Sequence, residues 1–286
     1  MQYLIGVDGG GSGCRVILTS IQGETLAKAE GGPANIETSF KTARENIIDA
    51  CKKAFKNAKI SENNFNNSFA ILGLAGSNLG NYAAQLSDKL PFARNKILND
   101  GEITLEGAIG PVDGCIGALG TGSVFVGRKN GITKLTGGWG FSLGDDGSGA
   151  KLGKELMRLS IRCHDGLNEH TDLTIEFLKK FKNNIKSIVE ITKSFKPKDY
   201  ADFAPEIFTA MDNHDSNAKK IIESEVILIE QSLMASGFSE QNAFCLIGGL
   251  GKLFLPFLSD KFINTCKPPK GNALQGAIAI AKREFF

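Results

Sequence analysis

The first thirty residues alternate between polar and apolar positions in the way a strand meander does. Tyr3, Ile5 and Val7 are apolar at every second position, which is the period of a strand with one buried face. The glycine-rich stretch 8–13 then predicts a tight turn, and the β-rich run 16–18 predicts a second strand. The sequence therefore predicts a hairpin at the start of the chain.

Beyond this meander the period changes, and helices alternate with strands. Thr38 or Ser39 can cap a helix, because apolar residues follow at helical spacing: Ala43, Ile47, Cys51, Ala54 and Phe55. The next runs predict a strand at Ser68–Leu74, a helix at 78–90, a strand at 96–98 and a helix at 102–109. This alternation predicts an α/β fold.

An internal repeat divides the chain. At an offset of 111, residues 5–12 lie without a gap over residues 116–123, and five of the eight positions are identical. A β-rich run follows each copy, which predicts two related domains, each with a mixed sheet flanked by helices. We expect the first domain at 1–113, completed by a C-terminal helix at 273–286, and the second at 114–272. A mostly helical insertion at about 150–240 precedes the last predicted strand.

The two glycine-rich hairpins suit a polyphosphate ligand. Backbone N–H groups in such turns form concave anion sites, and glycine lets the ligand approach the backbone. A Walker A loop is excluded because Lys252 and Lys154, each after a glycine, are followed by Leu253 and Glu155 rather than Ser or Thr. A dinucleotide fingerprint would need glycine where Cys14 stands.

Composition and charge exclude several classes of protein. Lys and Arg number 33 and Asp and Glu 31, so the formal charge of +2 predicts no nucleic-acid partner. The six cysteines form no Cys-x-x-Cys pair and the three histidines no zinc spacing, so we expect reduced thiols and no structural zinc. The N-terminus lacks a basic segment, and the apolar stretch 243–258 is too short for a membrane span. We therefore expect a soluble, cytoplasmic protein without a membrane partner.

Ordered motifs along the chain resemble a known family. Three of them are similar to the phosphate-1, phosphate-2 and adenosine motifs of the sugar kinase/actin/heat-shock-70 superfamily: Asp8-Gly9-Gly10-Gly11-Ser12, Leu119-Gly120-Thr121-Gly122-Ser123 and Ile247-Gly248-Gly249-Leu250-Gly251. Within it, the segments 99–108 and 137–148 resemble the catalytic and sugar-binding segments of the N-acetylglucosamine and glucosamine kinases of the BadF/BadG/BcrA/BcrD group. The resemblance implies two ribonuclease-H-like (actin-like ATPase) domains with a ligand cleft between them. It also implies a homodimer that uses ATP and Mg²⁺ to phosphorylate the 6-hydroxyl of an amino sugar.

Two carboxylates carry the predicted chemistry. Asp100 follows a short strand and begins a glycine-containing turn, where its carboxylate can accept the proton of a sugar hydroxyl. The family reading also makes Asp100 the general base, and a turn or helix cap is the alternative. Asp8 stands in the first glycine-rich hairpin and can hold Mg²⁺ through water, with an Asx turn as its alternative. The second copy of the repeat has Leu119 at that position.

The resemblance assigns the ligand contacts as well. Those to the nucleotide fall on Gly10, Gly11, Ser12, Gly120, Thr121, Gly122, Ser123, Gly248, Gly249 and Gly251. Those to the sugar fall on Asn35, Asp100, Gly138, Trp139 and Asp145. Core packing is the alternative for Trp139. The eukaryotic N-acetylglucosamine kinases have Asp-Glu where this chain has Asp145-Asp146, which leaves the role of Asp146 and the fine substrate choice open.

Other functions remain open on the sequence alone. N-acetylmuramic acid is a third candidate sugar. The stretches 32–36 and 198–208 favour glucosamine, and the stretch 137–140 favours N-acetylglucosamine. An ATPase activator of a radical dehydratase belongs to the same group, but it needs exposed, suitably spaced cysteines for an iron–sulfur cluster, and the six cysteines here are scattered. A nucleotide-binding regulator with a decayed site is the third class, and the presence of Asp8, Asp100 and Asp145 argues against it.

Overall fold

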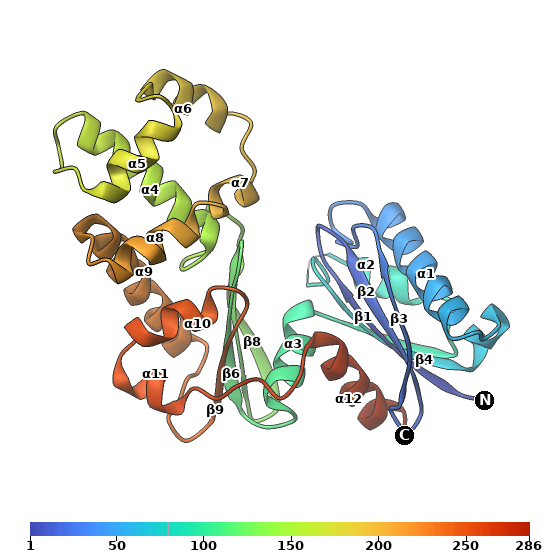
Figure 1. The fold of residues 1–286 in the computed structure, drawn as a ribbon. Helices are drawn as coiled ribbons and strands as arrows, with labels where there is room; N and C mark the ends of the chain where they lie inside the picture. The colour runs from blue at the N-terminus through green and yellow to red at the C-terminus, as the bar shows by residue number, and fades with distance from the viewer. Residues whose placement is uncertain (79) are drawn as a thin grey trace. The chain divides into compact units, whose positions relative to one another are not determined.

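The computed structural model describes residues 1–78 and 80–286, which form two units (Figure 1). Unit 1 comprises Met1–Val112 together with Pro268–Phe286, and unit 2 comprises Asp113–Lys267. The C-terminal segment therefore returns to the unit that contains the N-terminus. Residue 79, which belongs to the helix predicted at 78–90, lies outside the described residues.

The sheet of unit 1 has the strand order β3-β2-β1-β4-β5. Its strands are β1 (Tyr3–Gly9), β2 (Cys14–Ser20), β3 (Thr25–Gly31), β4 (Ser68–Leu74) and β5 (Arg94–Leu98). The first three form an antiparallel meander, as the alternation predicted, whereas β4 and β5 run parallel to β1. The sheet is therefore mixed, and the carboxyl ends of its three parallel strands meet at one edge.

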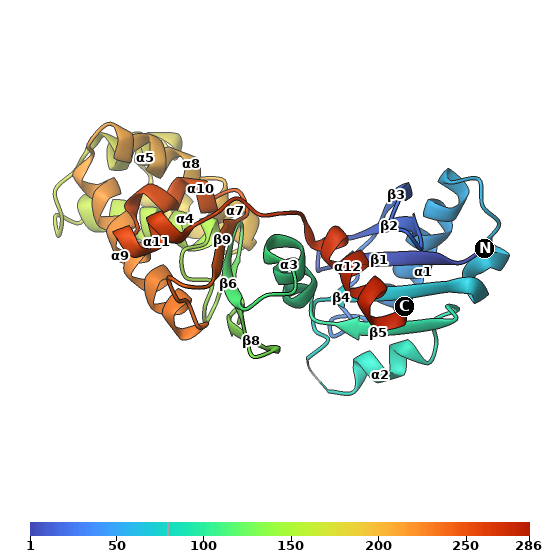
Figure 2. The ribbon, with the colours of Figure 1, turned by 90° about the horizontal axis from the view of Figure 1, so that it is seen from below.

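Helices cover both faces of this sheet (Figure 2). They are α1 (Phe40–Asn57), the 3₁₀ turn η1 (Glu62–Asn67), α2 (Tyr82–Ser87), α3 (Asp100–Ile109) and α12 (Ala273–Phe285). On β1, the alternate residues Tyr3, Ile5 and Val7 pack into the core that includes α1, whereas Leu4 packs into the core that includes α12. Both faces of β1 are buried, as in the central strand of a sheet between two helical layers.

Two predicted helices differ in length from the structure. Within the helix predicted at 78–90, the structure has α2 over Tyr82–Ser87, and Leu90 precedes Pro91, a position that disfavours helical backbone. The helix predicted at 102–109 begins two residues earlier, at Asp100, because the Asn99 side chain caps it. The second difference brings Asp100 into a helix.

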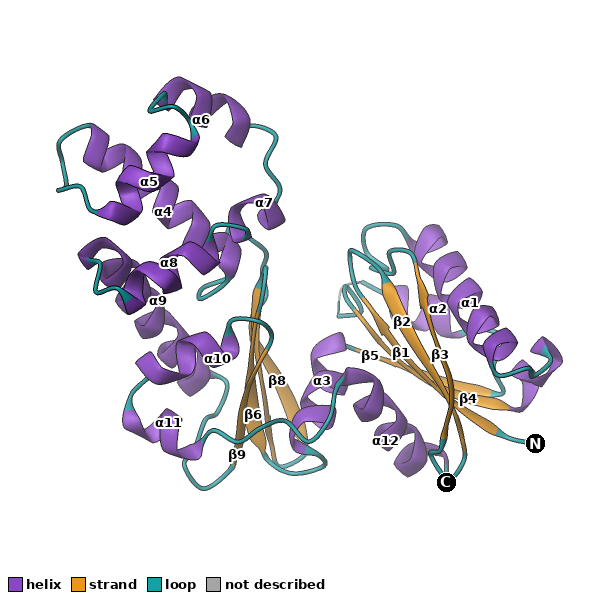
Figure 3. Ribbon diagram, in the orientation of Figure 1, coloured by secondary structure: helices purple, strands orange, loops and turns teal. Residues whose placement is uncertain are grey.

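The sheet of unit 2 has the order β8-β7-β6-β9. Figure 3 draws the strands of both sheets in orange and the helices in purple. Its strands are β6 (Gly114–Leu119), β7 (Ser123–Lys129), β8 (Ile132–Gly137) and β9 (Ala243–Ile247). Strands β6, β7 and β8 form an antiparallel meander, and β9 is parallel to β6. This order repeats that of β3-β2-β1-β4, which confirms the predicted α/β fold with two mixed sheets flanked by helices.

Most of the helices of unit 2 lie between β8 and β9, where the sequence predicted a helical insertion. They are α4 (Gly149–His164), α5 (Asp172–Lys180), α6 (Ile185–Thr192), α7 (Pro197–Ala201), α8 (Ala204–Asp212) and α9 (Ser216–Ala235). After β9 come α10 (Gly251–Phe254), the 3₁₀ turn η2 (Leu255–Phe257) and α11 (Asp260–Thr265). Phe125 of β7 and Ile229 of α9 belong to one core that joins sheet and helices. Among the described residues, no helix is both long and apolar enough to span a membrane.

Candidate functional site

Asp8 and Asp100 lie at the same edge of the unit 1 sheet. Asp8 on β1 is paired in register with Gly73 on β4, and Gly73 is paired with Leu98 on β5. Two strand spacings separate Asp8 from Leu98, or about 10 Å between backbones. Asp100 follows Leu98 by two residues, so strand pairing alone brings both predicted acids to one edge.

Local hydrogen bonds fix the Asp100 backbone. The Asn99 side chain accepts the amide proton of Gly101 at 2.9 Å, and the Glu102 carboxylate accepts that of Asn99 at 3.1 Å, which together make a capping box. Burial raises the pKa of Asp100, the nearby charge of Asp8 raises it further, and the Gly101 N–H opposes both. A carboxyl group whose pKa is raised toward neutrality is a better general base than an ordinary one.

The helix that carries Asp100 is clamped by the C-terminal helix. A side chain on Gly107 of α3 would meet the backbone of Asn272, and one on Gly276 of α12 would meet the backbone of Ile103. Arg283 of α12 donates to the buried carboxylate of Glu106 at 2.8 Å. The C-terminal segment therefore holds α3, and with it Asp100, against the sheet of unit 1.

Asp8 is paired with a residue that sequence reasoning missed. Arg15 on β2 forms an ion pair with the Asp8 carboxylate. The two residues are directly opposite in the antiparallel register, where side chains on one face of a sheet lie close together. Because this pairing follows from the register of the hairpin, Arg15 could have been identified from the predicted strands. The guanidinium supplies positive charge next to the carboxylate proposed for Mg²⁺.

Asn35 lies in a loop that is bonded to the same edge. The Ala34 amide donates to the Gly10 carbonyl at 2.9 Å, and the Ile36 amide donates to the Ala75 carbonyl at 3.2 Å. The Asn35 side-chain oxygen accepts the amide protons of Glu37 and Thr38, which turns the loop. The structure thus brings Asn35, Asp8 and Asp100 to one edge of unit 1.

The glycines of the first hairpin face open space. A side chain at Gly10 or Gly11 would meet no atom within 4 Å, and both have φ outside the left-handed region. Neither the packing nor the backbone of the protein requires glycine here. Ser12 beside them is exposed. Glycine at these two positions leaves the backbone accessible.

The second hairpin is tied to a helix instead. The N-terminal amides of α4 donate to it, Gly149 to the Gly120 carbonyl at 2.8 Å and Ala150 to the Thr121 carbonyl at 3.1 Å. Thr121 is exposed, whereas Ser123 is buried and its hydroxyl donates to the Asp146 carbonyl at 2.7 Å. The proton of the Ser123 hydroxyl is therefore engaged within the protein.

The predicted adenosine turn packs on the end of this hairpin. A side chain at Gly248, where φ is +84°, would meet the Leu119 backbone, and one at Gly251 would lie 3.1 Å from the Leu246 backbone. Gly249 between them has open space. The parallel register of β6 and β9 thus brings the adenosine turn beside the phosphate-2 turn within unit 2.

The predicted sugar-binding segment meets the same hairpin. Asp145 is only 8% exposed and has a left-handed φ of +62°, which is rare for a residue with a side chain. A side chain on Gly122 would lie 3.0 Å from the Asp145 carboxylate, and the Ser123 amide donates to that carboxylate. Burial raises the pKa of Asp145, this amide lowers it, and the charge of Asp146 raises it.

Trp139 does not pack in the core, the alternative considered from the sequence. It is 77% exposed, between Gly138 and Gly140, which both have left-handed backbone. Such backbone turns the chain away from the sheet after β8 ends at Gly137, and the indole remains in solvent. The Trp139 ring is therefore accessible from solvent.

The residues present fit a magnesium ion bound together with a nucleotide. Mg²⁺ keeps several waters and takes one or two carboxylates plus phosphate oxygens, rather than an all-protein cage. Asp8 is one such carboxylate, and no group of three or more acidic, histidine or cysteine ligands occurs among the described residues. Asp8 would supply one carboxylate to an ion whose other ligands are water and phosphate oxygens.

The cysteines do not fit an iron–sulfur cluster. Cys14, Cys51, Cys115, Cys163 and Cys245 are buried, and Cys266 is half-buried. Burial raises the pKa of Cys14 to about 11 and that of Cys115 to about 12, so both stay protonated at neutral pH. Cluster ligation needs accessible thiolates.

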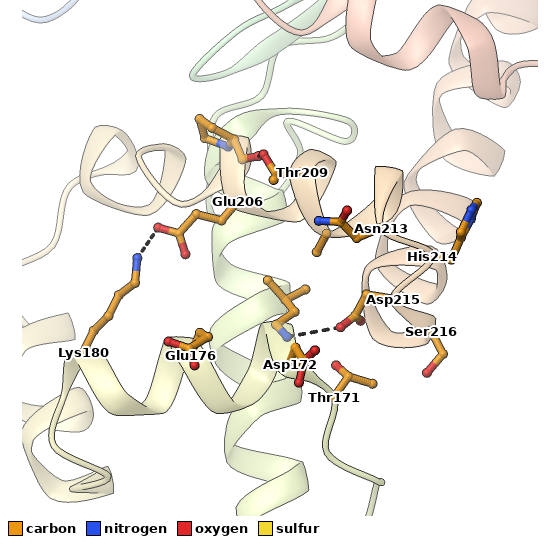
Figure 4. Close-up of a pocket in the computed structure, with 13 residues that line it drawn as sticks. Thr171, Asp172, Glu176, Lys180, Glu206, Thr209, Asn213, His214, Asp215 and Ser216 are labelled. Carbon is orange, nitrogen blue, oxygen red and sulfur yellow. Dashed lines mark hydrogen bonds and ion pairs between the residues drawn. The ribbon is translucent and has the colours of Figure 1, made fainter.

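A separate cavity of about 880 Å³ lies among α5, α8 and the start of α9 (Figure 4). Two of its acidic side chains are engaged within the protein. Asp215 accepts the amide protons of Leu173, Asn217 and Ala218, and Glu206 pairs with Lys180. None of the predicted site residues lines this cavity, and we assign it no ligand.

The chain is similar to proteins of known structure. A crystal structure from Chromobacterium violaceum, described as a candidate N-acetylglucosamine kinase, superposes with a TM-score of 0.87 at 30% identity and covers 98% of this chain and 99% of its own. The predicted actin-like ATPase fold is thereby confirmed. The chain belongs to the BadF/BadG/BcrA/BcrD ATPase family, whose model matches residues 5–268.

Two relatives with named activities are similar to this chain over nearly its whole length. The chain is 30% identical to the glucosamine kinase of Vibrio cholerae over 282 residues, which cover 98% of this chain and 96% of that protein. It is 27% identical to the N-acetylmuramic acid/N-acetylglucosamine kinase of Clostridium acetobutylicum, over 99% of both chains. The relatives are kinases of amino sugars and their derivatives.

Proposed function

We propose that this protein is an ATP-dependent kinase that transfers the γ-phosphoryl group of ATP to the 6-hydroxyl of glucosamine or N-acetylglucosamine. The observation that carries the proposal is the pair of acids at the edge of unit 1, with Asp100 fixed by a capping box and clamped through α3. Family membership and full-length similarity to amino-sugar kinases support it.

Asp100 is the proposed general base. The sugar oxygen forms a bond to the γ-phosphorus as the bond from that phosphorus to the β–γ bridging oxygen breaks, and Asp100 takes the hydroxyl proton. The products are ADP and a sugar phosphate monoester. The raised pKa of Asp100 favours this proton transfer, since burial weakens the solvation of its charged form.

The nucleotide contacts are proposed for both hairpins. Gly10, Gly11 and Gly249 present backbone with open space, and Ser12 and Thr121 present exposed hydroxyl groups. Asp8 would hold Mg²⁺ through water, and when bound the ion offsets the negative charge of the phosphates. The remaining nucleotide contacts are proposed for Gly120, Gly122, Ser123, Gly248 and Gly251.

The sugar contacts are proposed for Asn35, Gly138, Trp139 and Asp145, in addition to Asp100. Glucosamine carries an ammonium group near neutral pH and needs a carboxylate beside C2, whereas an acetamido group needs a neutral hydrogen-bond partner. Asp145 and Asn35 offer the two kinds of group. The Vibrio relative supports glucosamine, and the Clostridium relative makes N-acetylmuramic acid the alternative substrate.

The proposal is tested by ATP consumption with glucosamine, N-acetylglucosamine, N-acetylmuramic acid and glucose, each with Mg²⁺. We expect one or both of the first two sugars to be used well and glucose poorly. The dehydratase-activator alternative predicts no sugar-dependent turnover and a coloured protein after anaerobic purification, which the buried cysteines argue against. The homodimer and the cytoplasmic location stay predictions, for light scattering and cell fractionation to check.

A further inference from the structure

Glu225 is a buried carboxylate that the proposed reaction does not use. It is 2% exposed and lies on α9 among the buried residues Ile221, Ile222 and Ile229. These positions follow one another at helical spacing, so Glu225 occupies the apolar side of an amphipathic helix. A buried carboxylate costs free energy unless it is hydrogen-bonded, and its bonding partner is therefore informative.

That partner is the backbone of the predicted sugar-binding segment. The Gly147 amide donates to the Glu225 carboxylate at 2.7 Å, across 78 positions of sequence. Gly147 has φ of +75°, and a side chain there would meet Ile229, one turn further along α9. Helix α9 thus contacts Gly147 twice: Glu225 accepts its amide proton, and Ile229 packs against its Cα.

The other side of the segment is held by the phosphate-2 hairpin. Ser123 donates from its hydroxyl to the Asp146 carbonyl and from its amide to the Asp145 carboxylate. Residues 145–147 therefore lie between the start of β7 and α9. The left-handed backbone of Asp145 is maintained because the start of β7 and helix α9 hold the segment from its two sides.

We propose that Glu225 is a positioning residue, which in its ionised form anchors Gly147 and so holds the Asp145 carboxylate in the orientation that receives the sugar. This inference rests on the proposed function for the role of Asp145. A carboxylate accepts an amide hydrogen bond more strongly than a neutral carboxyl group does. Protonation of Glu225 therefore loosens the segment, and sugar affinity falls as the pH falls.

The charged groups around Glu225 come from two elements. Lys151 and Glu155 lie on α4, and Asp146 lies in the segment itself. Burial raises the pKa of Glu225, the Gly147 amide and Lys151 lower it, and Asp146 and Glu155 raise it. Glu225 is therefore protonated at a higher pH than an exposed glutamate, and the hydrogen bond to Gly147 weakens at that higher pH.

The first test needs no substrate. The amide resonance of Gly147 is followed by NMR in the ligand-free protein as the pH is lowered from 8 to 5, in the wild type and in Glu225→Gln. Gln keeps the size and one acceptor oxygen but cannot titrate. We expect the wild-type resonance to titrate and the Gln variant to lose that titration, while Glu223→Gln, an exposed control on the same helix, behaves as wild type. A resonance that titrates equally in both Glu225 forms overturns the inference.

The second test separates positioning from stability. We expect Glu225→Ala to raise the KM of the sugar roughly tenfold or more, with a smaller change in kcat and an unchanged KM for ATP, since a displaced binding group costs affinity. We expect Glu225→Gln to restore most of the affinity at pH 7.5 and to remove the acid-side rise in KM. Trp139, the only tryptophan, lies in the same segment, and its fluorescence reports sugar binding independently of turnover.

The outcomes distinguish the two proposals. If the wild type phosphorylates no sugar, the proposed function fails, but the Gly147 titration still tests the anchor. If the wild type is active and Glu225→Ala and Glu225→Gln both lower the melting temperature without changing the KM of the sugar, Glu225 is structural only and the inference is wrong.

Discussion

The two glycine-rich hairpins share a strand order but differ in what holds them. The β1–β2 hairpin ends in Asp8, which pairs with Arg15, and Gly10 and Gly11 face open space. The β6–β7 hairpin has buried Leu119 in place of Asp8, and its carbonyls receive amides from α4. The two copies therefore share a strand order but not the side chains and hydrogen bonds around their turns.

The hairpins also differ in length, which the gapless alignment of the two copies concealed. In unit 1 Gly9 pairs with Cys14 across residues 10–13, whereas in unit 2 Leu119 pairs with Ser123 across residues 120–122. The two aligned serines are therefore not equivalent. Ser12 is an exposed loop residue, while Ser123 begins a strand and bonds the sugar-binding segment. The first hairpin therefore has four unpaired residues at its turn and the second has three.

The largest expected effect is at Asp100, which has no counterpart at the edge of unit 2. Asp100→Asn keeps the shape of the side chain but removes the base, so we expect kcat to fall roughly 10²–10⁴-fold. The KM of the sugar should change far less. Steady-state kinetics measure both, with Asp49→Asn, an exposed change on α1, as the matched control. Near-normal turnover of Asp100→Asn would show that another group takes the proton.

The first hairpin has the carboxylate of Asp8 where the second has Leu119. We expect Asp8→Asn to raise the KM for Mg–ATP roughly 10–100-fold, because a carboxylate that holds the hydrated ion is lost. Raising the Mg²⁺ concentration should restore part of the affinity. Calorimetric titration of the variant with Mg–ADP gives the same comparison without turnover. Unchanged binding would leave Asp8 as the partner of Arg15 alone.

Gly248 and Gly249 are adjacent but have different reasons to be glycine. Gly248→Ala places a side chain against the Leu119 backbone at a left-handed φ, so we expect it to lower the stability of the fold by about 1–2 kcal/mol or more. Gly249→Ala meets no protein atom, so we expect normal stability and about tenfold weaker nucleotide binding if ATP approaches this backbone. Thermal melts and nucleotide titrations of both variants check the contrast. Normal nucleotide binding by Gly249→Ala would remove this turn from the site.

The smallest expected effect is a shift in the pH dependence of kcat/KM, which tests whether Asp100 is the base. The pKa of Asp100 is raised, so its carboxylate is protonated, and inactive as a base, at a higher pH than an ordinary aspartate. As the pH falls, kcat/KM should therefore begin to decline above the range of a free aspartate. Asp8→Asn removes one cause of the raised pKa of Asp100, so the decline of kcat/KM should move to lower pH. The profiles of both proteins are measured at saturating Mg²⁺. A decline at the same pH in both proteins would contradict the coupling of the two acids.

The sequence predicted the scaffold well because strand alternation and the repeat are local signals. It predicted Asp8 near the end of a strand and Asp100 just after one, although Asp100 begins a helix rather than a turn. It missed Arg15, whose role depends on register, and Glu225, whose partner is 78 positions away. It also allowed Trp139 a place in the core, whereas left-handed glycines on either side carry the indole into solvent. Long-range hydrogen bonds and backbone conformation, which composition does not encode, account for these differences.

The central claim is phosphorylation of an amino sugar, and ³¹P NMR of the product tests it directly. The protein is incubated with ATP, Mg²⁺ and glucosamine, N-acetylglucosamine or glucose in turn. The account predicts a new phosphomonoester signal coupled to the C6 protons with at least one amino sugar, and little product from glucose. Efficient phosphorylation of glucose with neither amino sugar used would contradict the specificity, and the absence of product from every sugar would contradict the assignment as a sugar kinase.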